Sequence, residues 1–116
     1  ASGQAVIGIS VLKGNYDLRH ATERLLQEAG TYGDFSILHD FHFGGYAKSD
    51  DSLLNFMREI WYDLRLTTDF VYTAKALFSI KALMAGNQFA QGSRILFIHT
   101  GGLQGNKSLP AGTLPF

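Results

Sequence analysis

The chain has 116 residues, which is enough for one domain with a modest hydrophobic core. Its formal net charge is zero, so there is no electrostatic case for a nucleic-acid partner or an anionic membrane. It has no cysteine, which excludes disulfides and cysteine catalysis, and it has no apolar run long enough to span a bilayer, so we expect a cytoplasmic protein.

The first third of the chain reads as two strands that flank a helix. Residues 5–12 are rich in Val and Ile and predict a strand. A helix is expected over residues 17–29, because its apolar residues recur at spacings of three and four, and Gly30 ends it as a C′ glycine. The short apolar run 35–38 predicts a second strand, and residues 40–45 read as a loop.

Two further helices are expected in the middle of the chain. The first begins at a capping aspartate, Asp50 or Asp51, and runs to about residue 64. Its predicted buried stripe consists of Leu53, Met57, Ile60, Trp61 and Leu64. The second runs over residues 73–84 and ends at a Gly-Asn pair, and its apolar residues cover more than one stripe, which predicts a well-buried helix.

The stretch that follows combines an apolar run with a polar, glycine-rich end. Residues 94–99 predict a strand buried on both faces, as in the middle of a parallel sheet. Thr100 and the pair Gly101-Gly102 then fall at its carboxyl end, where ligands bind in open α/β sheets. A buried strand that ends in an ordinary glycine turn explains these residues equally well. Residues 103–116 show no period and are expected to be irregular.

The predicted order is β-α-β-α-α-β, which favours an α/β fold with parallel strands and right-handed crossovers. The first and last strands are both of the buried type, so we expect neighbouring strands that are not in this chain. Ala1 opens the chain without a methionine, directly before a strand. We therefore interpret residues 1–116 as a single incomplete domain.

Three other stretches carry residue types that are common in metal, catalytic or cofactor-binding sites. Asp40 and His42 share one face of an extended segment, but two ligands rarely suffice for a metal, so no metal site is predicted. Tyr46 follows a glycine pair, and Tyr72 and Thr73 stand at a helix start, where free N–H groups favour anions. Each also fits a plain structural role, as an exposed loop aromatic or a packed helix start. Together they suit an aromatic cofactor that bears a phosphate, although neither a Walker loop nor GxGxxG is present.

Three motifs, in order and at matching spacing, resemble one enzyme family. They are Gly44-Gly-Tyr-Ala-Lys48, Asp69-Phe-Val-Tyr-Thr-Ala-Lys75 and Gly92-Ser-Arg-Ile-Leu-Phe-Ile-His-Thr-Gly-Gly102. They are similar to the carboxyl-terminal part of the pyridoxal-phosphate (PLP) enzymes that comprise 1-aminocyclopropane-1-carboxylate (ACC) deaminase and D-cysteine desulfhydrase. The resemblance covers nearly the whole chain. It implies part of the three-layer, parallel-sheet large domain of the tryptophan-synthase-β-like fold (fold type II).

The resemblance also implies roles for individual residues. Tyr72 and Tyr46 match the two active-site tyrosines, with Tyr72 near the amino-acid portion of the substrate. Thr100 matches the position beside the pyridine nitrogen of the cofactor, and Gly101, Gly102 and Thr73 are assigned to cofactor binding with it. ACC deaminases proper carry glutamate and leucine where this chain has Thr73 and Thr100. The implied activity is therefore closer to D-cysteine desulfhydrase, a β-elimination that gives pyruvate, ammonia and sulfide.

The sequence departs from the family at several points. Phe70 replaces a proline, and Ala74 replaces the glycine before Lys75, which affects how Tyr72 is presented. The Schiff-base lysine and the glycine-rich phosphate loop of the family lie upstream of what matches Ala1. None of the lysines in this chain matches the lysine motif, so the chain alone is not expected to be active.

Two classes of function remain open at this stage. The first is a part of a PLP-dependent amino-acid deaminase or lyase, completed by a missing amino-terminal half or by a partner chain, in a homo-oligomer that binds a small amino acid. The second is a non-catalytic, self-associating structural or binding module that keeps the fold. A stand-alone module normally protects an exposed strand edge with charge or proline, and no such device is present between Val6 and Val11, which favours the first class.

Overall fold

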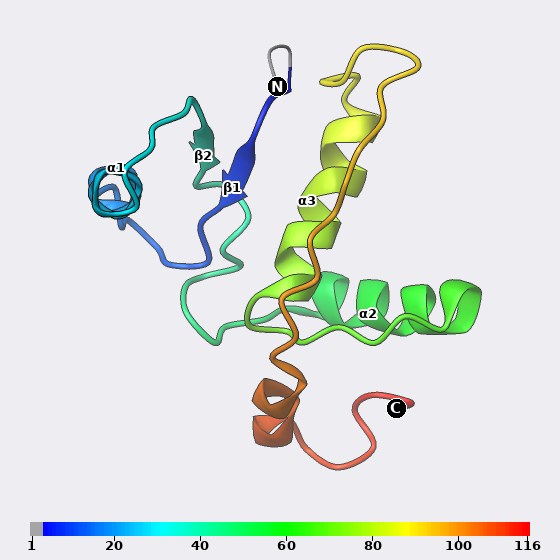
Figure 1. Cartoon of the computed structure of the whole chain (residues 1–116). Coiled ribbons are helices and arrows are strands. Elements are labelled where there is room, and N and C mark those ends of the chain that lie inside the picture. The colour runs from blue at the N-terminus through cyan, green and yellow to red at the C-terminus, as the bar shows by residue number, and fades with distance from the viewer. Residues whose placement is uncertain (1–3) are drawn as a thin grey trace.

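The computed structural model describes residues 4–116; the unusual opening residues 1–3 lie outside them. The elements along the chain are β1 (Ile7–Ile9), α1 (Leu18–Glu28), β2 (Ser36–Leu38), α2 (Asp51–Leu64), α3 (Thr73–Ala85) and the 3₁₀ helix η1 (Leu103–Ser108) (Figure 1). The α/β class and the three predicted helices are confirmed, whereas the strands are shorter than expected. The tail expected to be irregular contains η1.

The sheet of the described chain consists of two parallel strands, β1 and β2. Ile7 pairs with Ser36 and Ile9 with Leu38, and the ladder continues where the Ser10 N–H donates to the Leu38 carbonyl at 2.9 Å. Figure 1 shows α1 on the far side of β2 and α3 on the side of β1. Two parallel strands joined by a helix form a βαβ unit, as the sequence predicts.

The predicted strand over residues 94–99 is wrong for this structure. The segment is extended but forms no ladder, and it links the end of α3 to η1 as a long trace (Figure 1). Leu96 and Ile98 are 86% and 72% exposed. A strand in the middle of a parallel sheet has a neighbouring strand on each side. Within residues 4–116 the sheet consists of β1 and β2 alone, and neither pairs with residues 94–99. The three-layer arrangement of the family therefore stays a prediction.

The helix ends follow the capping residues that the sequence offers. The Asp50 carboxylate accepts the Leu53 N–H at 2.9 Å and begins α2, as expected. Gly30 has a φ of 71°, and the Thr31 N–H donates to the Leu26 carbonyl at 3.0 Å, which closes α1 as a Schellman motif. Asn87, with a φ of 56°, ends α3 in the same way. No helix in residues 4–116 is long and apolar enough to cross a membrane.

The hydrophobic core lies where α2 meets α3. Its buried apolar side chains are Leu53, Met57, Phe70, Val71 and Ala74. Phe78 adds an edge-on contact to Phe56, with ring centroids 5.3 Å apart. The predicted stripe of α2 is correct for Leu53 and Met57 but wrong for Leu64, which is 67% exposed in the last helical turn. Burial therefore fades along α2 from its amino end to its carboxyl end.

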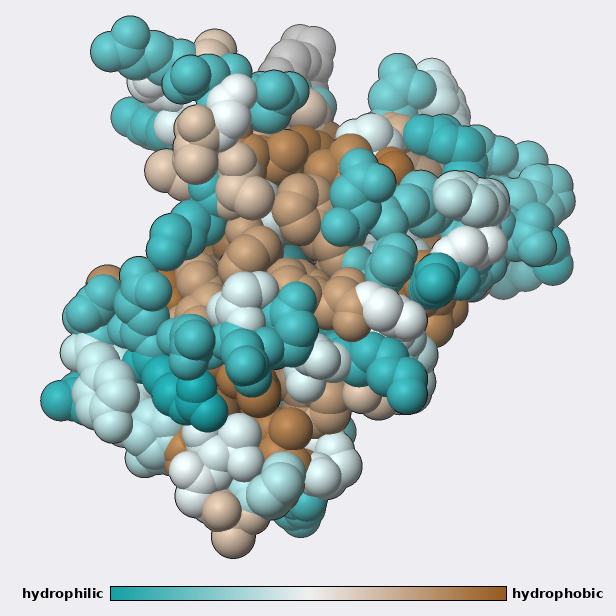
Figure 2. Space-filling view, turned by 180° about the vertical axis from the view of Figure 1, so that it is seen from behind, coloured by the Kyte–Doolittle hydropathy of each residue, from teal (hydrophilic) through white to brown (hydrophobic). Residues whose placement is uncertain are grey.

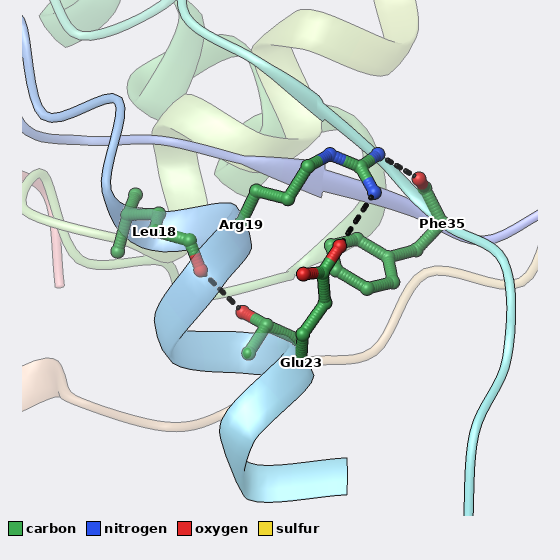
Figure 3. A network of polar contacts seen from close by, with 5 residues as sticks. Leu18, Arg19, Glu23 and Phe35 are labelled. Atoms are coloured by element: carbon green, nitrogen blue, oxygen red, sulfur yellow. Dashed lines mark hydrogen bonds and ion pairs between the residues drawn. The ribbon is translucent and has the colours of Figure 1, made fainter. Parts of the chain in front are cut away.

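Helix α1 is attached to the sheet mainly by one arginine (Figure 3). The Arg19 guanidinium donates to the Phe35 carbonyl, lies 4.5 Å from the centre of the Phe35 ring, and pairs with Glu23 at 3.4 Å. The ion pair joins two half-exposed side chains and contributes little, since exposed pairs of this kind are worth about 0.3–0.5 kcal/mol. No residue of α1 is buried, although its apolar residues recur at helical spacing.

Candidate functional site

The start of α3 is organised around the buried carboxylate of Asp69. Its Oδ1 accepts the backbone N–H groups of Val71 at 3.0 Å and Tyr72 at 2.7 Å. Its Oδ2 accepts the Thr73 N–H at 3.0 Å. These are the N–H groups that a helix start leaves without partners. These hydrogen bonds, made by a fully buried carboxylate, fix the turn that carries Tyr72.

Thr73 faces into this network. Its hydroxyl donates to Asp69 Oδ2 at 2.5 Å and accepts the Asp69 N–H at 2.8 Å. The residue is 2% exposed. Its assignment to cofactor binding stays a prediction. In the structure the Thr73 hydroxyl holds the Asp69 carboxylate in place, so Thr73 supports the turn before α3.

Tyr72 and Tyr46 meet although they lie 26 residues apart in the sequence. The Tyr72 hydroxyl donates to the Tyr46 Oη at 3.3 Å, and the two rings lie edge to face with centroids 6.0 Å apart. Both rings are partly open to solvent, at 46% and 54% exposure. The two residues that the family resemblance marks as active-site tyrosines thus lie together at one solvent-accessible site.

The contact between the two tyrosines shifts the pKa of Tyr72. Its hydrogen bond to Tyr46 raises the pKa of the Tyr72 phenol above its ordinary value of 10.0, and partial desolvation and the charge of Asp69 raise it further. The donated hydrogen bond favours the neutral phenol over the phenolate. Tyr72, like an ordinary tyrosine, is protonated at neutral pH. Its hydroxyl donates to Tyr46, and the hydroxyl hydrogen of Tyr46 is left for another acceptor.

The segment after the unpaired apolar run closes over Asp69. Gly102 has a φ of 83°, and a Cβ at this position would lie 3.2 Å from Asp69 Oδ2, so any other residue would be strained and crowded here. The Asn106 amide accepts the Phe70 N–H at 3.0 Å and donates to the Thr68 carbonyl at 2.9 Å. These contacts tie residues 102–106 to the turn before α3.

Thr100 and Gly101 lie at the exposed end of the same segment. His99 anchors it, since its Nε2 lies 2.8 Å from the Thr67 carbonyl and its Nδ1 accepts the Gly101 N–H at 3.1 Å. Thr100 is exposed, and a Cβ on Gly101 would meet nothing within 4 Å. Both residues thus border open space, but the structure brings only Gly102 into contact with the Asp69 network.

The sequence reading missed two residues of this network, Lys75 and Asn106. Lys75 is fully buried, and its ammonium donates to the carbonyls of His42 at 2.7 Å and Gly45 at 2.9 Å. A lysine between two alanines in a helix of apolar character was the available signal. The partners of Lys75 and Asn106 lie about 30 residues or more away, where local pattern carries no information.

The two histidines near β2 have structural contacts. His42 Nδ1 accepts the Gly44 N–H at 3.0 Å, and the His39 ring packs on Tyr16 with centroids 4.7 Å apart. Among residues 4–116 no group of three or more His, Asp or Glu side chains is placed to hold a metal ion.

Comparison with known proteins gives relatives of one kind. A protein of Pyrococcus horikoshii, provisionally named 1-aminocyclopropane-1-carboxylate deaminase, is 29% identical over 104 residues, which cover 85% of this chain and 31% of the relative. Proteins of the same provisional name from Pyrococcus furiosus and Pyrococcus abyssi are 30% and 26% identical, with similar coverage. The chain thus spans about a third of the length of the curated relatives that it matches. No family model and no solved structure matches it.

Proposed function

We propose that residues 1–116 form one part of a PLP-dependent amino-acid deaminase or lyase, and that they supply the tyrosine pair that meets the substrate. The proposal is carried by the hydrogen bond between Tyr72 and Tyr46 at 3.3 Å, which joins the two residues that the family resemblance marks as catalytic. The likeness to proteins provisionally named ACC deaminase supports the same family. The whole enzyme is proposed to be active, and this chain alone is not.

The residues around Thr100 fit a flat cofactor ring. The Thr100 hydroxyl is exposed and has no side-chain hydrogen bond within residues 4–116, and Gly101 adds no side chain beside it. A hydroxyl donates well to a neutral pyridine nitrogen. When bound, PLP supplies the electron sink that stabilises negative charge at the substrate Cα. Thr100 would hold the ring at its nitrogen, and Gly102 keeps the backbone there close to Asp69.

The covalent lysine of such an enzyme must come from elsewhere. The lysines of this chain lack the family motif, and the buried ammonium of Lys75 is bound by two carbonyls. Covalent attachment needs an accessible, neutral amine. The chain therefore contributes binding and proton-handling groups, not the covalent anchor.

The tyrosine pair is proposed to handle a proton at the substrate. Because Tyr72 stays protonated at neutral pH, its Oη is a donor from the outset. In a β-elimination the bond from Cβ to the leaving group breaks, and the leaving sulfur takes up a proton. Tyr72 can supply that proton once its O–H turns from the Tyr46 oxygen to the leaving sulfur. Tyr46, whose own hydroxyl hydrogen is left for another acceptor, can then return a proton to the Tyr72 oxygen.

The proposed substrate is D-cysteine. Elimination of sulfide and hydrolysis of the remaining amine give pyruvate, ammonia and hydrogen sulfide from D-cysteine and one water. Support for this choice over ACC comes from the threonines at positions 73 and 100, which match the desulfhydrase pattern in the family resemblance. A cyclopropane ring opening is the second candidate, favoured by the name that the relatives carry.

The surface of the chain supports a missing neighbour. Its accessible area is 8073 Å², whereas a folded protein of 12.8 kDa exposes about 6,300 Å². An open apolar groove of about 400 Å³ lies between α1 and the sheet, lined by Val6, Ile9, Leu18, Leu26, Phe35 and Ile37. Figure 2 shows a broad apolar area across the middle of the back face. We propose that the amino-terminal part of the enzyme, or a partner chain that replaces it, covers this surface, and that the assembled enzyme is a homo-oligomer.

Cofactor attachment tests the proposal. The chain of 116 residues is incubated with PLP, reduced with borohydride and weighed by intact mass spectrometry. We expect no one-to-one adduct on this chain, and a one-to-one adduct on a lysine upstream of Ala1 in a longer protein that contains it. A stoichiometric adduct on Lys13, Lys48 or another lysine of this chain contradicts the assignment of the anchor. The absence of any adduct in the longer protein contradicts the PLP enzyme and favours the non-catalytic module.

The substrate is tested on the same longer protein. Release of pyruvate and sulfide from D-cysteine is measured beside release of 2-oxobutanoate and ammonia from ACC, at matched substrate concentrations. We expect pyruvate to dominate. A higher rate with ACC overturns the assignment to D-cysteine but leaves the PLP enzyme intact.

A further inference from the structure

The full burial of Lys75, beside the tyrosine pair, needs an explanation. Lysines are almost never fully buried unless they are paired, because removing an ammonium from water is costly. Lys75 is 0% exposed, yet no carboxylate lies within ion-pair distance of it among residues 4–116. Its ammonium is instead bound by the carbonyls of His42 at 2.7 Å and Gly45 at 2.9 Å.

Those two carbonyls belong to a loop with an unusual backbone. Phe43 and Ala47 have φ values of 57° and 54°, and Gly44 and Gly45 have φ values of 101° and 130°. Non-glycine residues in the left-handed region cost about 1 kcal/mol or more each and persist only where the surroundings hold them. Tyr46 lies directly between Gly45 and Ala47, which both have a positive φ, so the direction of the Tyr46 ring depends on the contacts that hold this backbone.

Three hydrogen bonds lie within the loop, and all have a neutral backbone N–H as donor. The Gly44 N–H donates to His42 Nδ1 at 3.0 Å. The Gly45 N–H donates to the His42 carbonyl at 3.2 Å, and the Lys48 N–H donates to the Gly45 carbonyl at 3.1 Å. Both bonds are at the long end of the normal range. The lysine ammonium binds the same two carbonyls more closely, and a charged donor forms roughly twice as strong a bond as a neutral one.

The positions of the two tyrosines relative to Lys75 complete the geometry. Tyr46 directly follows Gly45, whose carbonyl Lys75 holds. Tyr72 stands three residues before Lys75, at the start of α3. One side chain therefore links the backbone next to one phenol with the helix that begins at the other.

We infer that Lys75 is a positioning residue for the tyrosine pair: by holding the His42 and Gly45 carbonyls against α3, it sets the hydrogen-bonding distance between the Tyr46 and Tyr72 hydroxyls. The inference rests on the proposed function only where it assigns a catalytic purpose to the tyrosine pair. The link itself exists without cofactor or substrate, so it can be tested on the chain alone.

Burial also shapes the charge of Lys75. Desolvation lowers the pKa of its ammonium, and the negative charge of Asp69 acts in the opposite direction. Loss of one proton leaves two N–H donors for two carbonyls, so the link survives deprotonation. The ring of Phe43, which packs edge-on against Phe78 at 4.9 Å, attaches the loop to α3 a second time. Removal of the ammonium should therefore release Tyr46 locally without detaching the whole loop.

The test follows the ionisation of the phenols by NMR with tyrosine labelled at Cζ, which resolves the five tyrosines of the chain. In the unmodified chain, Tyr72 should titrate above pH 10, as the hydrogen bond to Tyr46 requires. The variant Lys75→Met keeps the bulk of the side chain and removes the donors. It should lower the Tyr72 midpoint as far as Tyr46→Phe does, whereas Lys75→Arg should restore much of the shift.

Lys81→Met is the matched control, since Lys81 lies on the same helix but is exposed and pairs with Glu59 on the surface. It should leave the Tyr72 midpoint unchanged. Circular dichroism at each pH verifies that the variants stay folded. A folded Lys75→Met variant with an unchanged Tyr72 midpoint overturns the inference, whatever the activity of the longer enzyme proves to be.

A second measurement needs no substitution and decides the matter if Lys75→Met fails to fold. Lysine labelled with ¹⁵N at Nζ should show one ammonium signal in the unmodified chain that exchanges slowly with water and couples across hydrogen bonds to the carbonyl carbons of His42 and Gly45. Fast exchange of all the lysine ammonium groups overturns the inference.

Discussion

Two regions of this chain differ in how well they are packed. The region of α2, α3 and the turn between them contains the whole hydrophobic core, from Leu53 to Ala74. The region of β1, α1 and β2 has a two-stranded sheet and a helix without a single buried residue. The chain has a radius of gyration of 15.3 Å, larger than the roughly 13 Å of a compact domain of this length.

This difference shows which region positions the residues of the site. Tyr72, Asp69 and Thr73 belong to the well-packed region, and the Tyr46 loop is held to that region by Lys75 and by the Phe43 ring. The side-chain contacts that hold the tyrosine pair therefore come from the well-packed region. The sheet region instead has the exposed apolar surface on which we propose the rest of the enzyme to pack.

The largest effect on stability is expected in the core of the packed region. Leu53→Ala removes a fully buried side chain between α2 and α3 and should lower the free energy of unfolding by about 2–5 kcal/mol. Urea unfolding followed by circular dichroism measures the loss. A loss below about 1 kcal/mol would mean that this core is not closed in solution.

A smaller effect is expected where the tail closes on the site. Asn106→Ala leaves the Phe70 N–H and the Thr68 carbonyl without their partner and should lower the free energy of unfolding by about 1–3 kcal/mol. Hydrogen exchange should show faster exchange at the Phe70 amide in particular. Asn55→Ala is the control, because Asn55 makes only an exposed bond to Arg58 and should change little.

The cap of α2 should matter next, and its effect should depend on pH. The Ser52 hydroxyl, which donates to Asp50 at 2.6 Å, and the Leu53 N–H hold the pKa of this carboxyl below its ordinary value. A lowered folded-state pKa means that the contribution is present above about pH 3.9 and is lost as the pH falls through the folded-state pKa. Asp50→Ala should cost about 1 kcal/mol at pH 7 and much less at pH 2. A cost that is equal at both pH values contradicts the role of the ionised cap.

The smallest effect is expected in the sheet region. Leu25 on α1 is 65% exposed, so Leu25→Ala should change the free energy of unfolding by less than about 0.5 kcal/mol. A leucine-to-alanine substitution is thus expected to lower the free energy of unfolding strongly at Leu53 and hardly at all at Leu25. If Leu25→Ala costs as much as Leu53→Ala, α1 is packed against something in solution, and the comparison between the regions fails.

The helices could be predicted from the sequence because their signals are local. The cap at Asp50, the glycine stop at Gly30 and the apolar spacing of α2 each act within a few residues, and the structure follows them. The strand over residues 94–99 could not be predicted reliably, since an apolar run forms a strand only if another strand is there to pair with it. Residues 4–116 provide no such partner for it, and Leu96 is exposed.

The site divides in the same way. Tyr46 and Tyr72 were found by resemblance, and the structure places their hydroxyls 3.3 Å apart. The residues that hold them were not found. Lys75 reaches a loop 30 or more residues earlier in the chain, and Asn106 reaches back 36 or more residues, so both contacts exist only after the chain has folded. The roles of Thr100 and Gly101 in cofactor binding remain predictions.

The measurement that tests the central claim most directly is the kinetics of Tyr72→Phe in the longer enzyme that contains this chain. We predict that kcat for pyruvate release from D-cysteine falls by about 10²–10⁴-fold while the cofactor remains attached, because the substitution removes one hydroxyl that serves as proton donor. Tyr62→Phe, an exposed tyrosine on α2, is the matched control and should leave kcat unchanged. An unchanged kcat in Tyr72→Phe, with the cofactor bound, would contradict the assignment of the tyrosine pair to catalysis.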